Sequence, residues 1–236
     1  MIHPHPDAAI VIGILALQGA FIEHQDALQK ISLQKKIEVI QVRTAEELAK
    51  CAALVIPGGE STTIALLARL SGLLEPLRQF VKTKPVWGTC AGAILLSKNV
   101  EGAKKGGQEL LGGISITIAR NGWGSQVESF EADLDVPLLR DPERPFTGIF
   151  IRAPVVLSLD TTPEDPPIKV ISRLSPHYLP ESLTSSNLTH EPKTFVALQQ
   201  GLHFLTTFHP ELTQDNRFHE YFVRECVLPS LPPPLQ

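Results

Sequence analysis

Runs of apolar residues alternate with stretches of helical periodicity along the first hundred residues. The segment from Ala9 to Leu17 reads A-I-V-I-G-I-L-A-L, which is typical of a parallel strand covered on both faces. Thr44 and Glu47 form the pattern of a capping box that opens a short helix. This alternation predicts an α/β fold in which helices cover both faces of a parallel sheet. Further strands are expected at 37–42, 53–56 and 85–87, and helices at about 21–31, 61–70, 73–82 and 91–97.

The second half of the chain is more strand-like. Strands are expected near Ile114, Thr147 and Val170, and again over 195–208, where Gln200-Gly201 is a candidate hairpin turn. A closing helix is expected at about 214–227, and the sequence L-P-S-L-P-P-P-L-Q after it is not expected to continue that helix. We therefore expect a single domain over 1–228, a loop-rich, Pro- and Ser-rich insertion at about 159–193, and a flexible Pro-rich tail at 229–236.

The composition of the chain excludes several classes of protein and of binding partner. The 236 residues are 43% hydrophobic and 19% charged, which is enough for one α/β domain with a buried core. A net charge of -4 gives no basic surplus, so we expect no nucleic-acid partner. No apolar stretch reaches the length of a membrane span and the start lacks a secretory signal, so we expect a cytoplasmic protein without a membrane segment. The three cysteines lie far apart, which argues against a disulfide framework and a zinc site.

Cys90 stands in the segment Gly88-Thr-Cys-Ala-Gly92, between a predicted strand and a predicted helix. In this arrangement a nucleophile sits on a tight, strained turn, and its side chain projects from the carboxyl end of the sheet. The positive end of the helix dipole favours a thiolate at that position. A buried structural cysteine is the alternative. The flanking glycines and the change from strand to helix favour a nucleophile.

His209-Pro-Glu211 offers a base for that thiol, directly after the last predicted strand. Residues two apart on an extended segment share a face, so Glu211 can hold the imidazole of His209 in the required tautomer while His209 pairs with Cys90. The predicted triad is therefore Cys90, His209 and Glu211. Taken alone, H-P-E is also compatible with a loop that caps the final helix.

The segment Pro57-Gly-Gly-Glu-Ser61 separates a strand from a helix. Its glycines let the backbone approach a ligand closely, and free amides at a helix start can bind developing negative charge. The amides of Gly59 and Ala91 are expected to form an oxyanion hole. A plain turn in which Ser61 caps the helix is the alternative. Three such features at three strand ends favour the functional interpretation.

The other histidines are expected to take no part in the chemistry. His24, His203 and His219 are expected on helix or strand surfaces, and the rest lie in Pro-rich contexts. No pair has the metal-ligand spacing H-x-x-x-H, so we expect no metal site.

With P-G-G-E-S-T-T, G-T-C-A-G and F-H-P-E-L, the chain resembles the class I glutamine amidotransferases. More closely it resembles the glutaminase subunits of pyridoxal 5'-phosphate synthases. The narrower match depends on G-I-L-A-L-Q-G-A-F from Gly13, A-R-N-G-W-G-S-Q-V-E-S-F-E-A-D-L from Ala119 and F-I-R-A-P from Phe150. It extends from residue 13 to about 223, without the loop after Leu159. The resemblance implies a flavodoxin-like three-layer α/β fold with a mixed, mostly parallel central sheet.

The resemblance also implies hydrolysis of L-glutamine to L-glutamate and ammonia, without a cofactor. Cys90 would attack the side-chain amide, His209 would protonate the leaving ammonia and then activate water against the thioester, and Glu211 would orient His209. Gln18 is implied to organise the oxyanion region when the partner docks. The residues implied to bind glutamine are Gly59, Glu60, Ser61, Arg120, Ile151 and Arg152.

The implied partner is a pyridoxal 5'-phosphate synthase subunit with a (β/α)8 barrel. It would receive the ammonia through an internal tunnel and build pyridoxal phosphate from a pentose phosphate and a triose phosphate. Two features depart from the family pattern: the insertion at about 159–193 is longer than in compact members, and Cys51 stands where a polar residue is common. We interpret Cys51 as structural.

Three other functions are compatible with parts of the pattern. The chain could be a glutaminase that serves another synthase, a non-catalytic regulatory or scaffold subunit, or a cysteine peptidase or stress-response protein of similar fold. An intact triad and Gly-Gly loop argue against a silent subunit. A peptidase would not require the segments R-N-G-W-G-S-Q and F-I-R-A-P.

Overall fold

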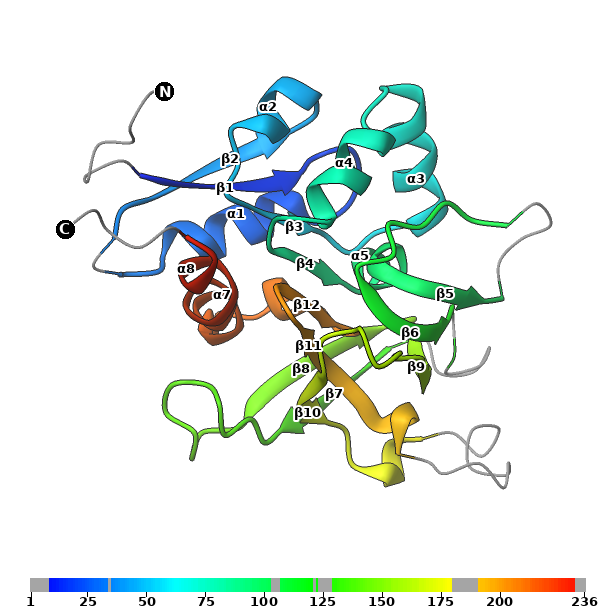
Figure 1. Ribbon diagram of the computed structural model, residues 1–236. Coiled ribbons are helices and arrows are strands. Elements are labelled where there is room, and N and C mark those ends of the chain that lie inside the picture. The colour runs from blue at the N-terminus through cyan, green and yellow to red at the C-terminus, as the bar shows by residue number, and fades with distance from the viewer. Residues whose placement is uncertain are drawn as a thin grey trace.

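A seven-stranded sheet forms the centre of the molecule, in the order β10-β11-β12-β4-β3-β1-β2 (Figure 1). The pairs β1/β2, β1/β3, β3/β4 and β4/β12 are parallel, whereas β10/β11 and β11/β12 are antiparallel. The sheet is therefore mixed and mostly parallel, as predicted. Its strands are β1 (Ile10–Leu15), β2 (Ile37–Val42), β3 (Ala53–Ile56), β4 (Val86–Thr89), β10 (Ile168–Arg173), β11 (Phe195–Gln200) and β12 (His203–Thr206). The computed structural model describes residues 9–33, 35–102, 107–120, 122, 129–179 and 191–231.

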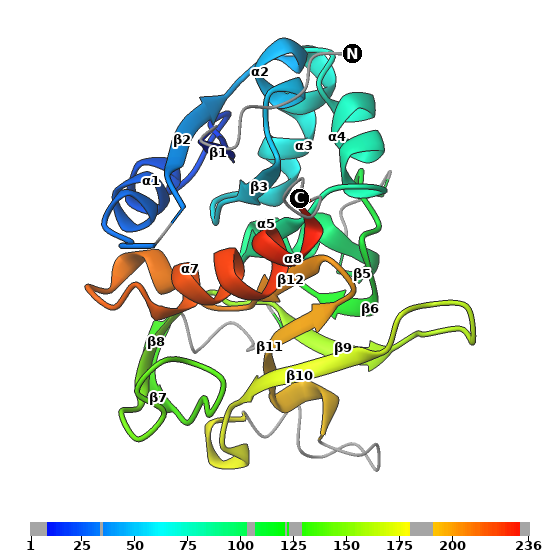
Figure 2. The same cartoon turned by 60° about the vertical axis from the view of Figure 1, so that its left-hand side comes forward.

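Helices cover both faces of this sheet (Figures 1 and 2). Alternate residues of β3 show the division: Val55 packs in one core cluster with residues of α1 and α7, and Leu54 packs in the other with residues of α3, α4 and α5. Among the described residues, the helices that contribute to these two clusters include α1 (Phe21–Gln29), α3 (Ser61–Leu70), α4 (Leu74–Val81), α5 (Ala91–Leu96) and α7 (Arg217–Phe222). The short α2 (Ala45–Ala49) begins at the predicted capping box.

Two smaller sheets contain three strands that the sequence did not indicate. One consists of β5 (Ser97–Glu101), β6 (Ile114–Ala119) and β9 (Val155–Leu159). The other is the antiparallel pair β7 (Ser129–Leu134) and β8 (Phe146–Ile151). The strands β5, β7 and β9 escaped prediction. In β5, for example, the sequence S-K-N-V-E is mostly exposed and carries no apolar alternation.

The region after Leu159 contains the strand expected near Val170, which is β10, and two 3₁₀ turns that were not expected. Within the predicted insertion, β10 pairs with β11, and the 3₁₀ turns η1 (Pro176–Tyr178) and η2 (Pro192–Thr194) flank residues outside the described ranges. The hairpin between β11 and β12 turns one residue later than predicted, at Gly201-Leu202. Gly201 has a φ of 54°, which is the left-handed region that favours glycine.

The C-terminal helix also differs from its prediction. It begins at Arg217 rather than near Gln214, passes through a π-helical turn at Val223–Val227 and continues as α8 (Leu228–Ser230). Residues 228–230 are therefore helical, although this segment was not expected to continue a helix. Pro229 is the second residue of α8, and the extended backbone of Leu231 ends the helix directly afterwards.

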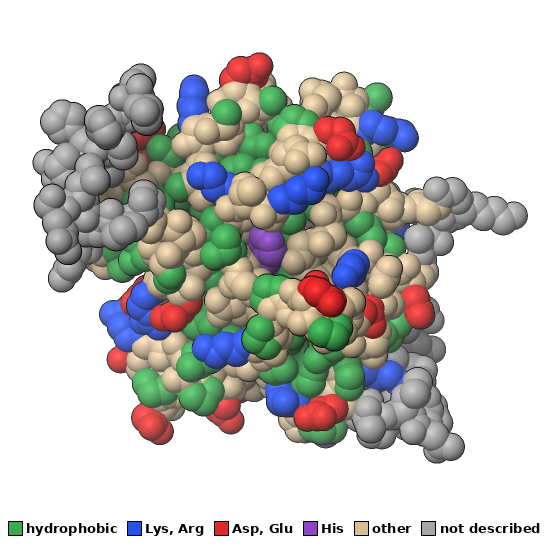
Figure 3. Space-filling view, in the orientation of Figure 1, with side chains coloured by type: hydrophobic (Ala, Val, Ile, Leu, Met, Phe, Trp, Pro, Cys, Tyr) green, Lys and Arg blue, Asp and Glu red, His purple; other side chains and the backbone are tan. Residues whose placement is uncertain are grey.

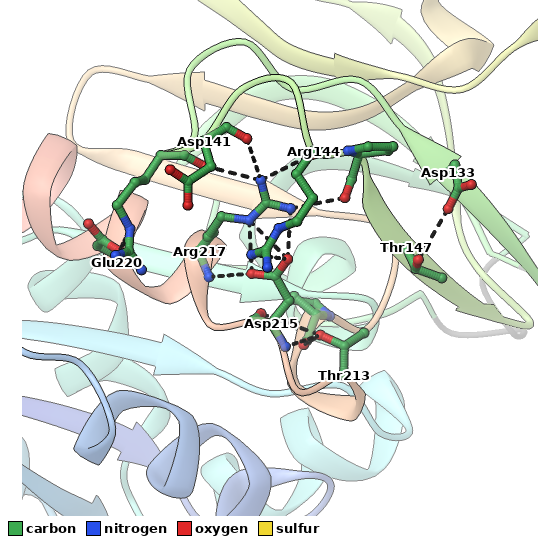
Figure 4. A network of polar contacts seen from close by, with 11 residues as sticks. Asp133, Asp141, Arg144, Thr147, Thr213, Asp215, Arg217 and Glu220 are labelled. Atoms are coloured by element: carbon green, nitrogen blue, oxygen red, sulfur yellow. Dashed lines mark hydrogen bonds and ion pairs between the residues drawn. The ribbon is translucent and has the colours of Figure 1, made fainter.

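A buried arginine fixes the loop before β8 to the segment after β12 (Figure 4). The guanidinium of Arg217 is paired with Asp215, and only 2% of its side-chain surface is exposed. Its remaining donors reach four backbone carbonyls, those of Arg140, Asp141, Arg144 and Pro145. Because β8 begins at the next residue, Phe146, this network sets the position of the β7–β8 hairpin.

The surface gives no sign of a single-sign electrostatic field on the face drawn in Figure 3, where Lys and Arg side chains are interspersed with Asp and Glu. Among the residues that the structure describes, no helix has both the length and the apolar character that a membrane span requires.

Candidate active site

Cys90 occupies the turn between β4 and α5, with φ 47° and ψ -102°. A non-glycine residue in such a conformation costs about 1–3 kcal/mol and persists only where its surroundings enforce it. Here they do: the amide of Cys90 donates a 2.9 Å hydrogen bond to the carbonyl of Thr206. A Cβ atom on Gly92 would lie 2.0 Å from the carbonyl oxygen of Ile56, and one on Gly88 would lie 2.4 Å from that of Gly92. The strained turn expected around Cys90 is present, and it requires both glycines.

His209 and Glu211 lie just after β12, the neighbour of β4. The Nδ1 atom of His209 is 2.7 Å from Oε1 of Glu211, and both residues are at least nine-tenths buried. The amide of His209 donates to the carbonyl of Ile149 on β8 at 2.8 Å. Burial alone would lower the pKa of His209, but hydrogen bonds to Cys90 and Glu211 and their negative charges outweigh burial and raise it to about 10. The imidazole is therefore protonated at neutral pH.

Gly58 lies against both His209 and Cys90. A Cβ atom at Gly58 would come within 2.3 Å of Cε1 of His209 and 3.3 Å of Cβ of Cys90. The structure thus brings all three residues of the predicted triad together, and the backbone of P-G-G-E-S packs directly on them. Burial raises the pKa of Cys51 to about 11 and that of Cys226 to about 12.

Gln18 contacts the same loop, as expected of a residue near the oxyanion region. Its side-chain oxygen accepts a 2.8 Å hydrogen bond from the amide of Glu60, and a Cβ atom on Gly59 would lie 2.6 Å from that oxygen. Ala91 is the first residue of α5, so its amide is one of those that have no partner within the helix. The oxyanion hole expected between the amides of Gly59 and Ala91 stays a prediction.

A second polar group forms at the start of α3. Arg120, after β6, donates to Oε1 of Glu60 at 2.6 Å and to Oε1 of Gln108 at 3.2 Å, and Ser61 donates to the same oxygen of Gln108 at 3.4 Å. Burial would raise the pKa of Glu60, but the hydroxyls and amide of neighbouring threonines and the charge of Arg120 lower it to about 2. Sequence reasoning missed Gln108, because no pattern singles it out.

The end of β8 reaches the thiol. Sγ of Cys90 is 4.0 Å from the carbonyl oxygen of Ile151, the contact of a weak S–H donor. The next residue, Arg152, has a φ of 42°, so the backbone is strained here as well. The carbonyl of Ile151 therefore lies near the thiol, and the substrate-binding roles expected of Ile151 and Arg152 stay predictions. Most of the segment R-N-G-W-G-S-Q, residues 121 and 123–128, lies outside the described residues.

The predicted surface location of two histidines is wrong. His24 on α1 and His219 on α7 were expected on surfaces, but both are 0% exposed, while His203 is half-buried. The surface prediction failed because the inner faces of α1 and α7 carry these polar rings, which pair with each other at 2.9 Å instead of meeting water. In the described part of the chain, no group of three or more His, Cys, Asp or Glu side chains could hold a metal ion.

The family comparison agrees with this geometry. The model of the SNO glutamine amidotransferase family matches residues 14–228. The chain belongs to this family. An Arabidopsis thaliana protein named probable pyridoxal 5'-phosphate synthase subunit PDX2 is 45% identical over 91% of the chain and 85% of its own length. The pyridoxal 5'-phosphate synthase subunit PdxT of Herpetosiphon aurantiacus is 43% identical over 91% of the chain and 99% of its own length.

Solved structures support the SNO-family assignment. A crystal structure of a glutamine amidotransferase, 40% identical in sequence, covers 90% of this chain and 97% of its own with a TM-score of 0.70. A putative GMP synthase subunit from Thermoplasma acidophilum, only 16% identical with a TM-score of 0.53, shares the fold alone. The predicted class, a flavodoxin-like α/β fold of the class I glutamine amidotransferase type, is confirmed.

Proposed function

We propose that this chain hydrolyses L-glutamine to L-glutamate and ammonia, as the glutaminase subunit of a pyridoxal 5'-phosphate synthase. One arrangement carries the proposal: a cysteine on a strained turn, a histidine beside it whose pKa is raised, and a buried carboxylate 2.7 Å behind the histidine. Supporting it, the relatives in Arabidopsis thaliana and Herpetosiphon aurantiacus are named as subunits of that synthase. The cytoplasmic location expected from the sequence stays a prediction.

The thiolate of Cys90 attacks the side-chain carbonyl carbon of glutamine. The negative charge that develops on the oxygen is stabilised by the amides of Gly59 and Ala91, and each such donor typically contributes ~10²–10³ in rate. His209 gives its proton to the departing nitrogen, which leaves as ammonia. A thioester between Cys90 and the glutamyl group remains. Water then attacks the thioester, His209 takes up a proton, and glutamate is released.

Glu211 keeps His209 in the orientation that these proton transfers need. Its 2.7 Å contact fixes Nδ1 as the nitrogen facing the carboxylate, which leaves Nε2 for the thiol and the leaving group. The carboxylate also offsets the burial that would otherwise discharge the imidazole. Glu211 therefore acts on the substrate through His209.

The polar group at the start of α3 is suited to the amino-acid end of glutamine. An α-carboxylate requires a cation or amides, and an α-ammonium requires a carboxylate. Arg120 and Glu60 supply both charges, and they already pair at 2.6 Å. We propose that Gly59, Glu60, Ser61 and Arg120 bind this end of the substrate, and that Ile151 and Arg152 close the site from β8.

We propose a (β/α)8-barrel synthase subunit as the partner that receives the ammonia. Transfer through a dry path would keep ammonia unprotonated, whereas most of it would become ammonium in neutral water. Docking would act through Gln18, whose side chain is bonded to the amide of Glu60 beside the predicted oxyanion donor Gly59.

Glutamate release from glutamine tests the proposal, measured with and without the barrel subunit. We expect low activity for the wild type alone, stimulation by the partner, and none for Cys90→Ala. Cys51→Ala is the matched control and should behave as the wild type. Activity that survives Cys90→Ala would refute the mechanism. No activity in the presence of the barrel subunit would favour a scaffold, and stimulation by a different synthase would favour a glutaminase of another pathway.

A further inference from the structure

A pair of buried imidazoles lies behind the triad. His24 from α1 and His219 from α7, two helices that pack on the same face of the sheet (Figure 2), are joined at 2.9 Å between Nδ1 of His24 and Nε2 of His219. Both rings pack edge-on against the indole of Trp87, with centroid distances of 5.4 and 4.8 Å. Neither ring reaches solvent, so each proton position must be satisfied inside the protein.

Glu211 presents one oxygen to each side. Its Oε1 faces His209, whereas its buried Oε2 accepts no hydrogen bond of standard geometry from the described residues. The nitrogen beside that oxygen is Nε2 of His24, at 3.4 Å. Nε2 also lies 3.1 Å from the hydroxyl oxygen of Thr89, the residue before Cys90. The position of the His24 ring therefore determines whether Oε2 of Glu211 has a hydrogen-bond donor nearby.

The contacts select one tautomer for each ring. If Nε2 of His24 carries the proton, it can donate to the hydroxyl oxygen of Thr89 at 3.1 Å and its positive edge faces the carboxylate oxygen 3.4 Å away, and Nδ1 accepts from Nε2–H of His219. Among the described residues, Nδ1 of His219 then has no donor, so what remains unpaired on the two rings is one lone pair. In the opposite arrangement a lone pair would face the carboxylate, and Nδ1–H of His219 would be a buried donor without an acceptor. The first arrangement avoids both penalties.

Both rings contribute a dipole rather than a charge. Burial, together with the neighbouring His219 and His209, holds the pKa of His24 well below its ordinary value, and burial lowers that of His219 to about 3. The titratable groups that meet here are His24 from α1, His219 from α7, His209 and Glu211 after β12, and Cys90 after β4.

We propose that His24, oriented by His219, is a positioning residue of this site: its Nε2–H holds the Oε2 atom of Glu211 and so keeps Oε1 aligned on His209. The triad becomes a chain of five side chains, from His219 through His24, Glu211 and His209 to Cys90. The inference rests on the proposed function for its effect on turnover, but not for its effect on the reactivity of the thiol.

Two substitutions separate the donor from the volume it occupies. In His24→Gln the terminal amide nitrogen can take the place of Nε2, whereas His24→Leu fills the space without a donor. A hydrogen bond to a charged group contributes about 1.5–3 kcal/mol, so we expect His24→Leu to lower kcat at least ~10-fold with little change in KM. His24→Gln should recover most of that loss. Trp87→Phe is the control, because it disturbs the packing of both rings and leaves the polar chain intact.

The pH dependence of Cys90 alkylation by iodoacetamide provides a readout without glutamine. A less well-held Glu211 stabilises the imidazolium of His209 less, so the thiolate forms at higher pH. We expect the alkylation midpoint to move upward in His24→Leu and to stay near the wild-type value in His24→Gln and Trp87→Phe. If glutamate release fails altogether, the proposed function is wrong, and this midpoint still decides the role of His24.

If His24→Leu folds and its kcat and alkylation midpoint equal those of the wild type, the proposal is wrong. It is also wrong if kcat falls equally in His24→Leu, His24→Gln and Trp87→Phe, in proportion to the stability that each variant loses. Nitrogen-15 NMR of the histidines in the unaltered protein is independent of any variant. The expected result is a neutral ring protonated on Nε2 at His24. A ring protonated on Nδ1, or an imidazolium, would overturn the proposal even if His24→Leu does not fold.

Discussion

The amide of Cys90 donates a 2.9 Å hydrogen bond to the carbonyl of Thr206, so the turn that bears the thiol is joined to the strand that leads to His209. β4 and β12 are parallel neighbours, with Thr89 opposite Thr206. Because the carboxyl ends of parallel strands lie at the same edge of a sheet, two segments far apart in the sequence meet there. The geometry of the triad is thus a property of the sheet register, and it should be sensitive to small additions at this edge.

Gly58→Ala should reduce activity while the protein stays folded. The added methyl group would lie 2.3 Å from Cε1 of His209, so the imidazole or the loop that carries residue 58 must shift and the alignment of His209 with Cys90 changes. A displacement of about 1 Å in a catalytic group can cost ~10²-fold in rate, and we expect a loss of that order in glutamate release. Gly72→Ala is the control: Gly72 has φ 73° and open space around its Cα, so alanine should lower stability slightly and leave activity unchanged. Equal activities of the two variants would contradict the predicted contact.

Glu211→Gln should lower kcat while glutamine binding persists. The amide retains the shape of the side chain but removes the charge that helps to raise the pKa of His209. With a lower pKa the imidazole is a less abundant proton donor above neutrality, so activity should decline at a lower pH than in the wild type. Proton transfer by a positioned group typically contributes ~10²–10⁴-fold, and we expect a loss near the lower figure. A pH–rate profile that coincides with the wild type would argue against the assigned role.

Arg217→Met should destabilise the fold severely. Removing the guanidinium leaves four carbonyls and Asp215 without their buried partner, and breaking such a buried pair costs about 3–5 kcal/mol. Urea unfolding followed by circular dichroism measures the change. Arg140→Met is the matched control, since the side chain of Arg140 is 64% exposed in its pair with Glu220 and should contribute less than ~1 kcal/mol. Similar unfolding midpoints for the two variants would show that the network is not needed.

Glu60→Gln should make the fold less sensitive to acid. The pKa of Glu60 falls from 4.5 to about 2 in the folded chain, so its stabilising contribution is complete above pH 4.5 and is lost as the pH falls towards 2. The side chain is 41% exposed, and solvent screening limits the effect to about 1 kcal/mol. Thermal melts at pH 7, 5 and 3 should show that the wild type is the more stable at pH 7 and that the difference shrinks at pH 3. A difference that grows with acid would reverse the sign and refute the assignment.

The central part of the fold could be predicted because local and global signals coincide there. The strands 37–42 and 53–56 are found at the predicted residues. The interior strand 53–56 is buried and apolar throughout, whereas 37–42 is the edge strand and carries the polar residues Glu38 and Gln41.

The proximity of Cys90, His209 and Glu211 could be predicted from local features of the chain. A strained turn requires Gly88 and Gly92, and the spacing of His209 and Glu211 is a local property of the chain.

Features that depend on distant partners escaped prediction. His24 and His219 read as surface residues because periodicity weighs polarity, and a polar ring that pairs with another inside the core gives no local sign of its burial. Gln108 escaped for the same reason: its neighbours Ser61 and Arg120 come from other segments. Pairing also gives β5 its extended form, since it lies in register with β6 and has little apolar pattern of its own.

The order of strands in the sheet has a consequence for biosynthesis. β12 is the last strand along the described chain, yet it lies between β4 and β11 in the interior of the sheet. A nascent chain that ends before β12 contains Cys90 but neither the carbonyl of Thr206 that holds its turn nor the imidazole of His209. Such long-range pairing is slow to form, because the loop must close before the contacts stabilise it. The thiol therefore stays without its activating partner until the C-terminal segment has been made and inserted.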